Sequence, residues 1–93
     1  MYWQMPLFLV VALQNSALAV DAAVSSKFPE GSYEIESGKW AVNADVTTAR
    51  ELSTKLGIRE TQSHIVFPLR GYSGRAKPDL WEWLSAQSAK VDV

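Results

Sequence analysis

The sequence predicts an α+β domain with the β-α-β-β-α-β order of a ferredoxin-like fold, followed by a C-terminal helix. Three observations predict it: a continuous apolar run at Leu7–Leu13, two alternating runs that meet at Ser37-Gly38, and stretches of helical periodicity between the strands. Right-handed crossovers then give a four-stranded antiparallel sheet of order 4-1-3-2. We expect residues 1–93 to form this single domain.

The first and last predicted strands differ in a way that fixes their places in the sheet. Leu7–Leu13 does not alternate, which is typical of a strand buried on both faces. His64–Leu69 contains Pro68, which has no N–H for a ladder hydrogen bond and therefore belongs at a sheet edge. The first strand is thus expected inside the sheet and the last at its edge, as the topology requires.

Two alternating runs, Ser32–Glu36 and Lys39–Ala44, flank the turn signal Ser37-Gly38. We expect them to form one hairpin with one face in water. Glu34 and Glu36 would then lie together on that wet side, and not in a cation site.

Three helices are expected. The first runs from about Ser16 to Phe28, with Asn15 or Ser16 as its cap. The second runs from Thr48 to Leu56, capped by Thr47 or by a Thr48–Glu51 capping box. The third begins near Pro78, a residue suited to a first helical turn.

Composition limits the chemistry that the chain can perform. There is no cysteine, so disulfides, thiolate metal sites and cysteine nucleophiles are excluded. A net charge of −1 excludes a strongly basic nucleic-acid binder but allows a local basic patch. We predict no cofactor, no metal site and no catalytic residue, and we favour a non-enzymatic role.

The first 19 residues support two interpretations. The apolar run followed by Ala17-Leu18-Ala19 resembles a cleavable secretory signal, which would make this a small secreted protein. Signal peptides carry positive charge before the apolar run, however, and the first Lys or Arg here is Lys27. We therefore predict a buried strand in a cytoplasmic protein, with no membrane partner, and keep the secreted protein as the alternative.

His64 is the only histidine in the chain. It is expected to be a surface residue at the start of a strand, because partners for a catalytic or metal role are not visible in the sequence. The adjacent Ser63 does not form a dyad with it, since neighbouring strand residues point to opposite faces.

The segment 70–77 is the candidate binding site. Arg70, Tyr72, Arg75 and Lys77 place three cations and one aromatic ring just before a helix N-terminus. Helix N-termini and arginine side chains both bind anionic groups, so a phosphate or a nucleic acid would be the ligand of such a site. We favour the simpler interpretation, a solvated connector whose glycines only permit turns.

Trp81 and Trp83 lie two residues apart on the third predicted helix and diverge by about 200°. One ring can therefore enter the core while the other does not follow it, and an exposed Trp often marks an interface. We predict a homodimer whose interface includes Phe67 and Trp81 or Trp83.

The chain also resembles a known group of proteins. Its apolar first strand, Trp-Ala-Val arm at 40–42, Thr-capped helix and the segment IVFPLRGYSGRAKPDLWEWL at 65–84 resemble small uncharacterised bacterial proteins. Those proteins are similar to the CRISPR-associated ferredoxin-like proteins and the virulence-associated, toxin-type endoribonucleases. The resemblance implies a cytoplasmic homodimer of ferredoxin-like subunits.

In the nuclease members of that group, an Asp at the end of the first strand contributes to metal-dependent cleavage. The matching stretch here, Val11–Asn15, has no carboxylate. We therefore expect a non-catalytic homodimeric module with a regulatory or binding role. The alternative is an endoribonuclease-like protein that acts on nucleic acid without this carboxylate.

Overall fold

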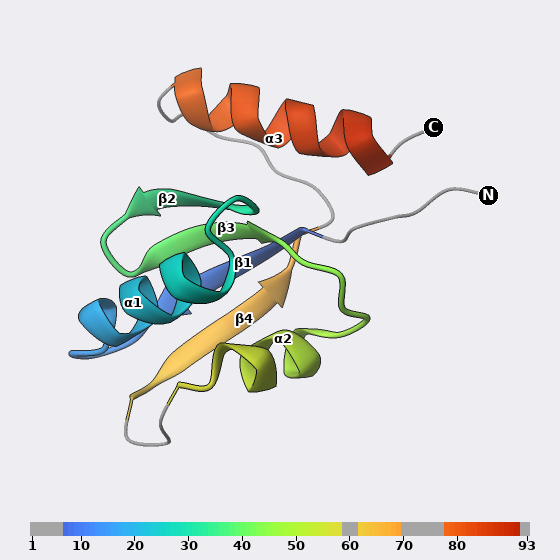
Figure 1. Cartoon of the computed structure of the whole chain (residues 1–93). Coiled ribbons are helices and arrows are strands. Elements are labelled where there is room, and N and C mark those ends of the chain that lie inside the picture. Colours follow the sequence, from blue (N-terminus) through green and yellow to red (C-terminus); the bar gives the residue numbers. More distant parts are fainter. Residues whose placement is uncertain (1–6, 59–61, 70–77, 92–93) are drawn as a thin grey trace.

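The computed structural model describes residues 7–58, 62–69 and 78–91, and for 87–91 it describes the backbone alone. The predicted element order is confirmed (Figure 1). The elements are β1 (Leu7–Ala12), α1 (Ala17–Lys27), β2 (Ser32–Glu36), β3 (Lys39–Asn43), α2 (Ala49–Leu56), β4 (His64–Pro68) and α3 (Pro78–Val91).

The four strands form one antiparallel sheet in the order β2-β3-β1-β4, which is the predicted order taken from the opposite edge. β1 lies between β3 and β4, and Val10 is opposite Trp40 on one side and Val66 on the other. The uninterrupted apolar sequence of β1 is explained by this central position, because both faces of the strand are covered or partly covered.

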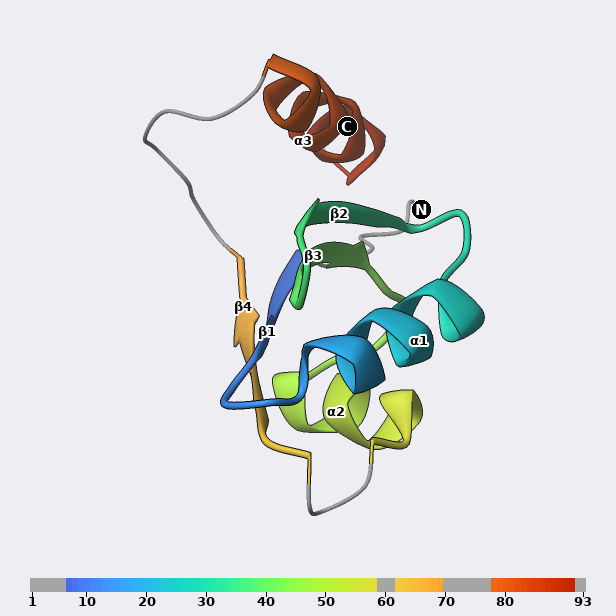
Figure 2. The same cartoon turned by 90° about the vertical axis from the view of Figure 1, so that its left-hand side faces the viewer.

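The main core lies between the sheet and the two helices α1 and α2. Both helices pack on the same face, as Figures 1 and 2 show. The fully buried side chains include Phe8 and Val10 from β1, Val20 and Val24 from α1, Val42 from β3, and Leu52 and Leu56 from α2. Each helix contributes residues four apart, so one stripe of each faces the strands.

The third helix covers part of the other face. Leu80 and Leu84 of α3 pack against Leu7 and Ala41, next to Tyr33 and Ile35 of β2. Figure 2 shows α3 beside β2, away from α1 and α2.

The prediction of a hairpin with one wet face was wrong. The register places Tyr33 opposite Ala41 and Glu34 opposite Trp40, so the apolar sets of the two strands lie on opposite faces. β3 is buried from Trp40 to Asn43 because α1 and α2 cover one side and α3 covers the other. The second face of β3 is covered by α3, which is distant in sequence. The alternation of residues within the hairpin therefore could not predict this burial.

The ends of α2 match the capping-box alternative. The Thr48 side chain accepts a hydrogen bond from the Glu51 N–H, and the Glu51 carboxylate accepts one from the Thr47 N–H. Gly57 ends the helix in the left-handed conformation, with φ of 66°. In α1, Ser16 occupies the cap position without a side-chain capping bond.

Candidate functional site

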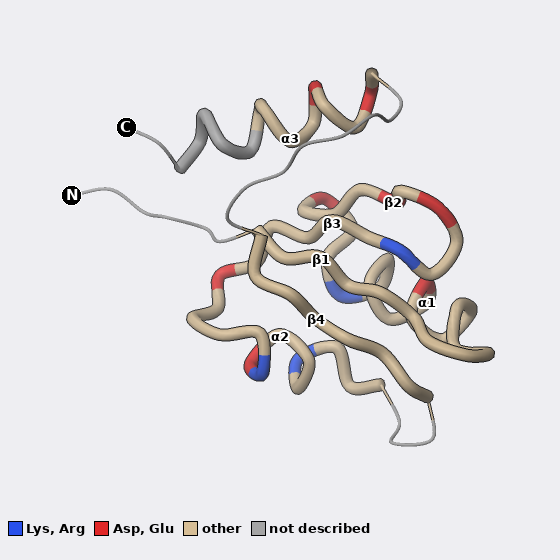
Figure 3. Tube along the Cα trace, turned by 180° about the vertical axis from the view of Figure 1, so that it is seen from behind, with Lys and Arg blue, Asp and Glu red and all other residues tan. Residues whose placement is uncertain are grey.

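β4 forms an open edge of the sheet. Among the described strands it pairs with β1 alone, and its sequence HIVFP contains no Lys, Arg, Asp or Glu. Figure 3 shows the strand without charged residues along its length. Natural edge strands commonly carry charges that prevent another strand from pairing with them. β4 has only a terminal proline in that role.

The hydrogen bonds to β1 determine which backbone groups of β4 are open. Leu13 donates to the Ser63 carbonyl at 2.9 Å, and Leu69 donates to the Leu7 carbonyl at 2.8 Å. In an antiparallel pair, hydrogen-bonded and non-hydrogen-bonded positions alternate. The backbone groups of His64, Val66 and Pro68 therefore point away from β1. The missing N–H of Pro68 falls on this open side and costs the β1–β4 ladder nothing.

An apolar strip accompanies this edge on the face opposite α1 and α2. It consists of Ile65 and Phe67 on β4 and their partners Val11 and Leu9 on β1. Ile65 is 40% exposed and Phe67 is 47% exposed, whereas Leu9 and Val11 are half-buried. We call these residues the β4 strip. α3 leaves them open because it packs towards β2, at the opposite edge of the sheet.

The two predicted interface tryptophans lie elsewhere. Trp81 and Trp83 are both half-buried, and both pack beside the cluster formed with Leu80 and Leu84. The Trp83 ring is 5.9 Å from the Tyr33 ring at an interplanar angle of 41°. The two indoles lie on either side of Leu80 and Leu84. Although they diverge, neither ring is fully exposed. Of the three predicted interface residues, only Phe67 lies in the β4 strip.

The predicted anion site at Arg70, Tyr72, Arg75 and Lys77 lies outside the described residues. Its role in binding stays a prediction from the sequence. It begins two residues after Pro68, so it follows directly from the β4 edge.

A serine–histidine pair joins α2 to β4, and the sequence did not indicate it. Ser53 Oγ lies 2.8 Å from His64 Nε2, and His64 Nδ1 faces the Gln62 carbonyl oxygen at 3.4 Å. His64 does begin a strand, as predicted, but its side chain is half-buried against the helix. The two residues are eleven apart with no recognisable motif, so only the packing of α2 on β4 brings them together.

Asp21 is a second polar centre that sequence analysis missed. Its carboxylate accepts hydrogen bonds from the Gly38 N–H at 2.8 Å, the Trp40 indole N–H at 2.7 Å and the Ser37 hydroxyl at 3.1 Å. Partial burial alone would raise the pKa of this carboxyl, but the hydrogen bonds from Trp40, Gly38 and Ser37 outweigh it and lower the pKa. One carboxylate of α1 thus accepts all three of these hydrogen bonds from the hairpin. We therefore infer a structural role for Asp21, which is to hold α1 against the hairpin.

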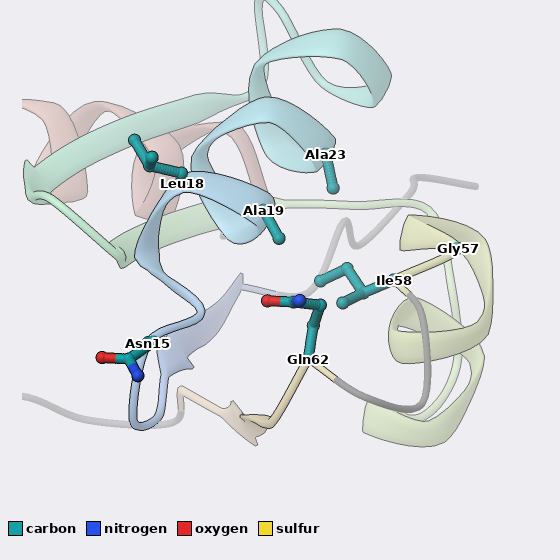
Figure 4. Close-up of a pocket in the computed structure, with 7 residues that line it drawn as sticks. All are labelled: Asn15, Leu18, Ala19, Ala23, Gly57, Ile58 and Gln62. Atoms are coloured by element: carbon teal, nitrogen blue, oxygen red, sulfur yellow. The ribbon is translucent and has the colours of Figure 1, made fainter.

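A shallow pocket of about 470 Å³ lies between α1 and the end of α2 (Figure 4). Ala19 and Ala23 of α1 face Ile58 and Gln62 across it. Asn15, Leu18 and Gly57 complete the lining. Gln62 is shared with the serine–histidine pair, because its carbonyl faces the imidazole. The pocket and the pair therefore have Gln62 in common, although neither Ser53 nor His64 lines the pocket.

Metal-binding clusters and membrane spans are both absent from the described residues. These residues contain no group of three or more His, Cys, Asp or Glu side chains that could hold a metal ion. No described helix is long and apolar enough to cross a membrane. Comparison with known proteins found no matching family model, no similar curated protein and no similar solved structure.

The fold is a ferredoxin-like α+β arrangement. Within it, the β4 edge has the features that bear most directly on function.

Proposed function

We propose that this protein is a non-catalytic homodimeric module in which two copies pair through β4, and that the joined surface serves a binding or regulatory role. The observation that supports the proposal is the coincidence of open backbone groups and exposed apolar side chains on one uncharged edge strand. Either feature alone is common. Together they form a surface that is complementary to itself.

The open backbone groups suit antiparallel pairing about a two-fold axis at Val66. At that register the Val66 N–H and carbonyl exchange hydrogen bonds with the same groups of the partner's Val66. The His64 N–H donates to the carbonyl of the partner's Pro68. Pro68 donates nothing in return, so the His64 carbonyl stays with water. The pairing joins two four-stranded sheets into one continuous sheet.

The same register pairs the exposed side chains. Residues on either side of the axis face each other across the strands, so Ile65 lies beside the partner's Phe67, and Phe67 lies beside the partner's Ile65. Aromatic and β-branched residues are favourable cross-strand neighbours, each pair contributing about 0.2–1 kcal/mol. The two β4 strips then meet at the axis and form one apolar surface. We propose this surface as the binding face of the dimer.

Sedimentation over a concentration series tests the proposal. The wild-type protein should approach twice the chain mass of 10.3 kDa at micromolar concentration. Phe67→Lys should shift it to the monomer, because a charge on an edge strand opposes strand pairing. Leu18→Lys is the matched control, since Leu18 is an 82% exposed apolar residue on α1, distant from the strip. A monomeric wild type, or equal effects of both substitutions, would reject the proposal.

The endoribonuclease-like alternative rests on segment 70–77 and on the resemblance. Its test is a cleavage assay on RNA and DNA with Mg²⁺ or Mn²⁺. If the segment only binds phosphate, affinity at low salt should fall steeply as salt is added and should decrease in Arg70→Ala/Arg75→Ala. Cleavage that needs the metal would instead replace the non-catalytic proposal.

A further inference from the structure

We infer that Ser53 is a nucleophile activated by His64, and that it accepts an acyl group from small activated esters. The inference does not depend on dimerisation through β4, and it would replace the description of the module as non-catalytic. It rests on the geometry of the pair, the Gln62 carbonyl beside the imidazole, the partial exposure of both side chains and a pocket that has Gln62 in common with the pair.

The geometry is that of a nucleophile and its base. Ser53 Oγ and His64 Nε2 are 2.8 Å apart, within the range of a strong hydrogen bond. Base and nucleophile side chains in serine-dependent enzymes lie at this separation, with a third group orienting the base. In this chain the third group is the Gln62 carbonyl oxygen, 3.4 Å from Nδ1.

The Gln62 carbonyl favours one direction of the Ser53–His64 hydrogen bond. A carbonyl oxygen can only accept, so the 3.4 Å contact is compatible with the tautomer that carries its proton on Nδ1. Nε2 of the neutral ring is then unprotonated and accepts the hydroxyl proton of Ser53. This tautomer is the one that a general base needs when the serine oxygen attacks.

Both members of the pair are partly exposed. Ser53 and His64 are both half-buried, so neither is enclosed by the core. Gln62, which orients the imidazole, also lines the pocket between α1 and α2. The methyl groups of Ala19 and Ala23 and the side chain of Ile58 make part of that pocket apolar. A short acyl chain fits such a lining better than a charged group does.

The proposed step is a transfer of one acyl group. Ser53 Oγ attacks the ester carbonyl carbon and forms a new C–O bond, while His64 Nε2 takes the hydroxyl proton. The bond from the carbonyl carbon to the leaving alcohol breaks, and His64 returns the proton to that alcohol. Water then hydrolyses the acyl-serine by the reverse path and releases the acid. No oxidant or further reactant is needed.

The pair lacks two features of an efficient hydrolase. Its orienting group is a neutral carbonyl, which stabilises an imidazolium less than a carboxylate does. Ser53 also lies within α2, beyond the capped first turn, where backbone N–H groups are used by the helix. We therefore expect slow transfer and an acyl-serine that accumulates.

The competing explanation is that the hydrogen bond only fastens α2 to β4. Both explanations predict that Ser53→Ala lowers stability, so stability does not separate them. Reactivity does, because a merely structural serine reacts no faster than any other hydroxyl.

The experiment treats the full chain with 4-nitrophenyl acetate and, separately, with a fluorophosphonate probe. Intact mass and peptide mapping then locate the adduct. We expect one adduct, at Ser53, formed at least about tenfold faster than at the exposed Ser26, a conservative figure for general-base assistance. His64→Gln should remove the advantage, whereas Ser26→Ala should not.

Mapping of the wild-type chain does not depend on any variant folding. An adduct spread over several exposed serines, no adduct at Ser53, or a rate at Ser53 equal to that at Ser26 would overturn the inference. Circular dichroism of His64→Gln identifies loss of fold. In that case the wild-type ratio of the rates at Ser53 and Ser26 carries the test, and equal rates would overturn the role of His64.

Discussion

The indole N–H of Trp40 donates a hydrogen bond to Asp21 Oδ1 at 2.7 Å, joining the hairpin strand β3 to helix α1. The same oxygen accepts from the Gly38 N–H, and Oδ2 accepts from the Ser37 hydroxyl. One carboxylate therefore satisfies the donors of the hairpin turn and of the largest buried ring in the main core. It fixes the hairpin against α1 on the face that holds that core.

Asp21→Ala should destabilise the protein by about 1–3 kcal/mol, because it leaves the Trp40 and Gly38 donors without their acceptor. Urea unfolding followed by tryptophan fluorescence measures this loss. Asp45→Ala is the control, since Asp45 is exposed. Equal midpoints for the two variants would show that the carboxylate has no such role.

Stability should also depend on pH through Asp21. Hydrogen bonds hold its pKa below the ordinary value of 3.8, so the folded state favours the ionised form. The contribution of the ionised Asp21 carboxylate to the free energy of unfolding is fully present above this ordinary pKa. It is lost as the pH falls through the lower pKa of the folded state. Asp21→Asn, which does not titrate there, should show a flatter loss of stability below about pH 4. Parallel acid-unfolding curves for the two proteins would contradict this.

Two glycines with positive φ should respond differently to alanine. Gly38 has φ of 82°, and a Cβ there would lie 3.0 Å from the Ala12 Cβ and 3.1 Å from the Ala17 Cβ. Gly57 has φ of 66° and open space around it. Gly57→Ala should cost about 1 kcal/mol from backbone strain alone. Gly38→Ala should cost clearly more, because the hairpin turn must also move away from α1 and β1. Thermal unfolding of both variants checks the order, and the reverse order would show that the turn is not tightly packed.

A fragment of residues 20–93 should not fold. It lacks all of β1, which is the central strand and supplies Phe8 and Val10 to the core. Without it, β3 and β4 have no partner between them. Circular dichroism and proton NMR of the fragment test this. A cooperatively folded fragment would favour the alternative in which the first 19 residues are a cleaved signal.

The sequence was sufficient for the architecture because its local signals agree with its topology. The apolar run at Leu7–Leu13 predicted the central strand, and Pro68 predicted the edge. The burial of β3 on both sides was missed because it depends on where α3 lies, which no local pattern contains. The positions of Trp81 and Trp83 beside Leu80 and Leu84 were missed for the same reason, because they also depend on where α3 packs on the sheet.

The sites were less predictable than the fold. Asp21 with Trp40, and Ser53 with His64, are joined by tertiary packing across nineteen and eleven residues. Neither pair has a characteristic spacing, so neither periodicity nor a sequence motif could predict it. Pro68 placed the strand of Ile65 and Phe67 at a sheet edge, which allows some exposure. The sequence did not indicate that these two side chains would be the exposed ones.

The two-fold register at β4 is the central claim, and cysteine cross-linking tests it most directly. The chain has no cysteine, so Ile65→Cys and Phe67→Cys each introduce a single thiol. The proposed register places residue 65 opposite the partner's residue 67 at a non-hydrogen-bonded position, with Cα atoms about 4.5 Å apart, which a disulfide can span. Identical positions are diagonal neighbours about 7–8 Å apart, which it cannot span without backbone movement. Mild oxidation should therefore link the two variants when they are mixed and leave each one unlinked alone, whereas linking no greater in the mixture than in either variant would contradict the proposed dimer.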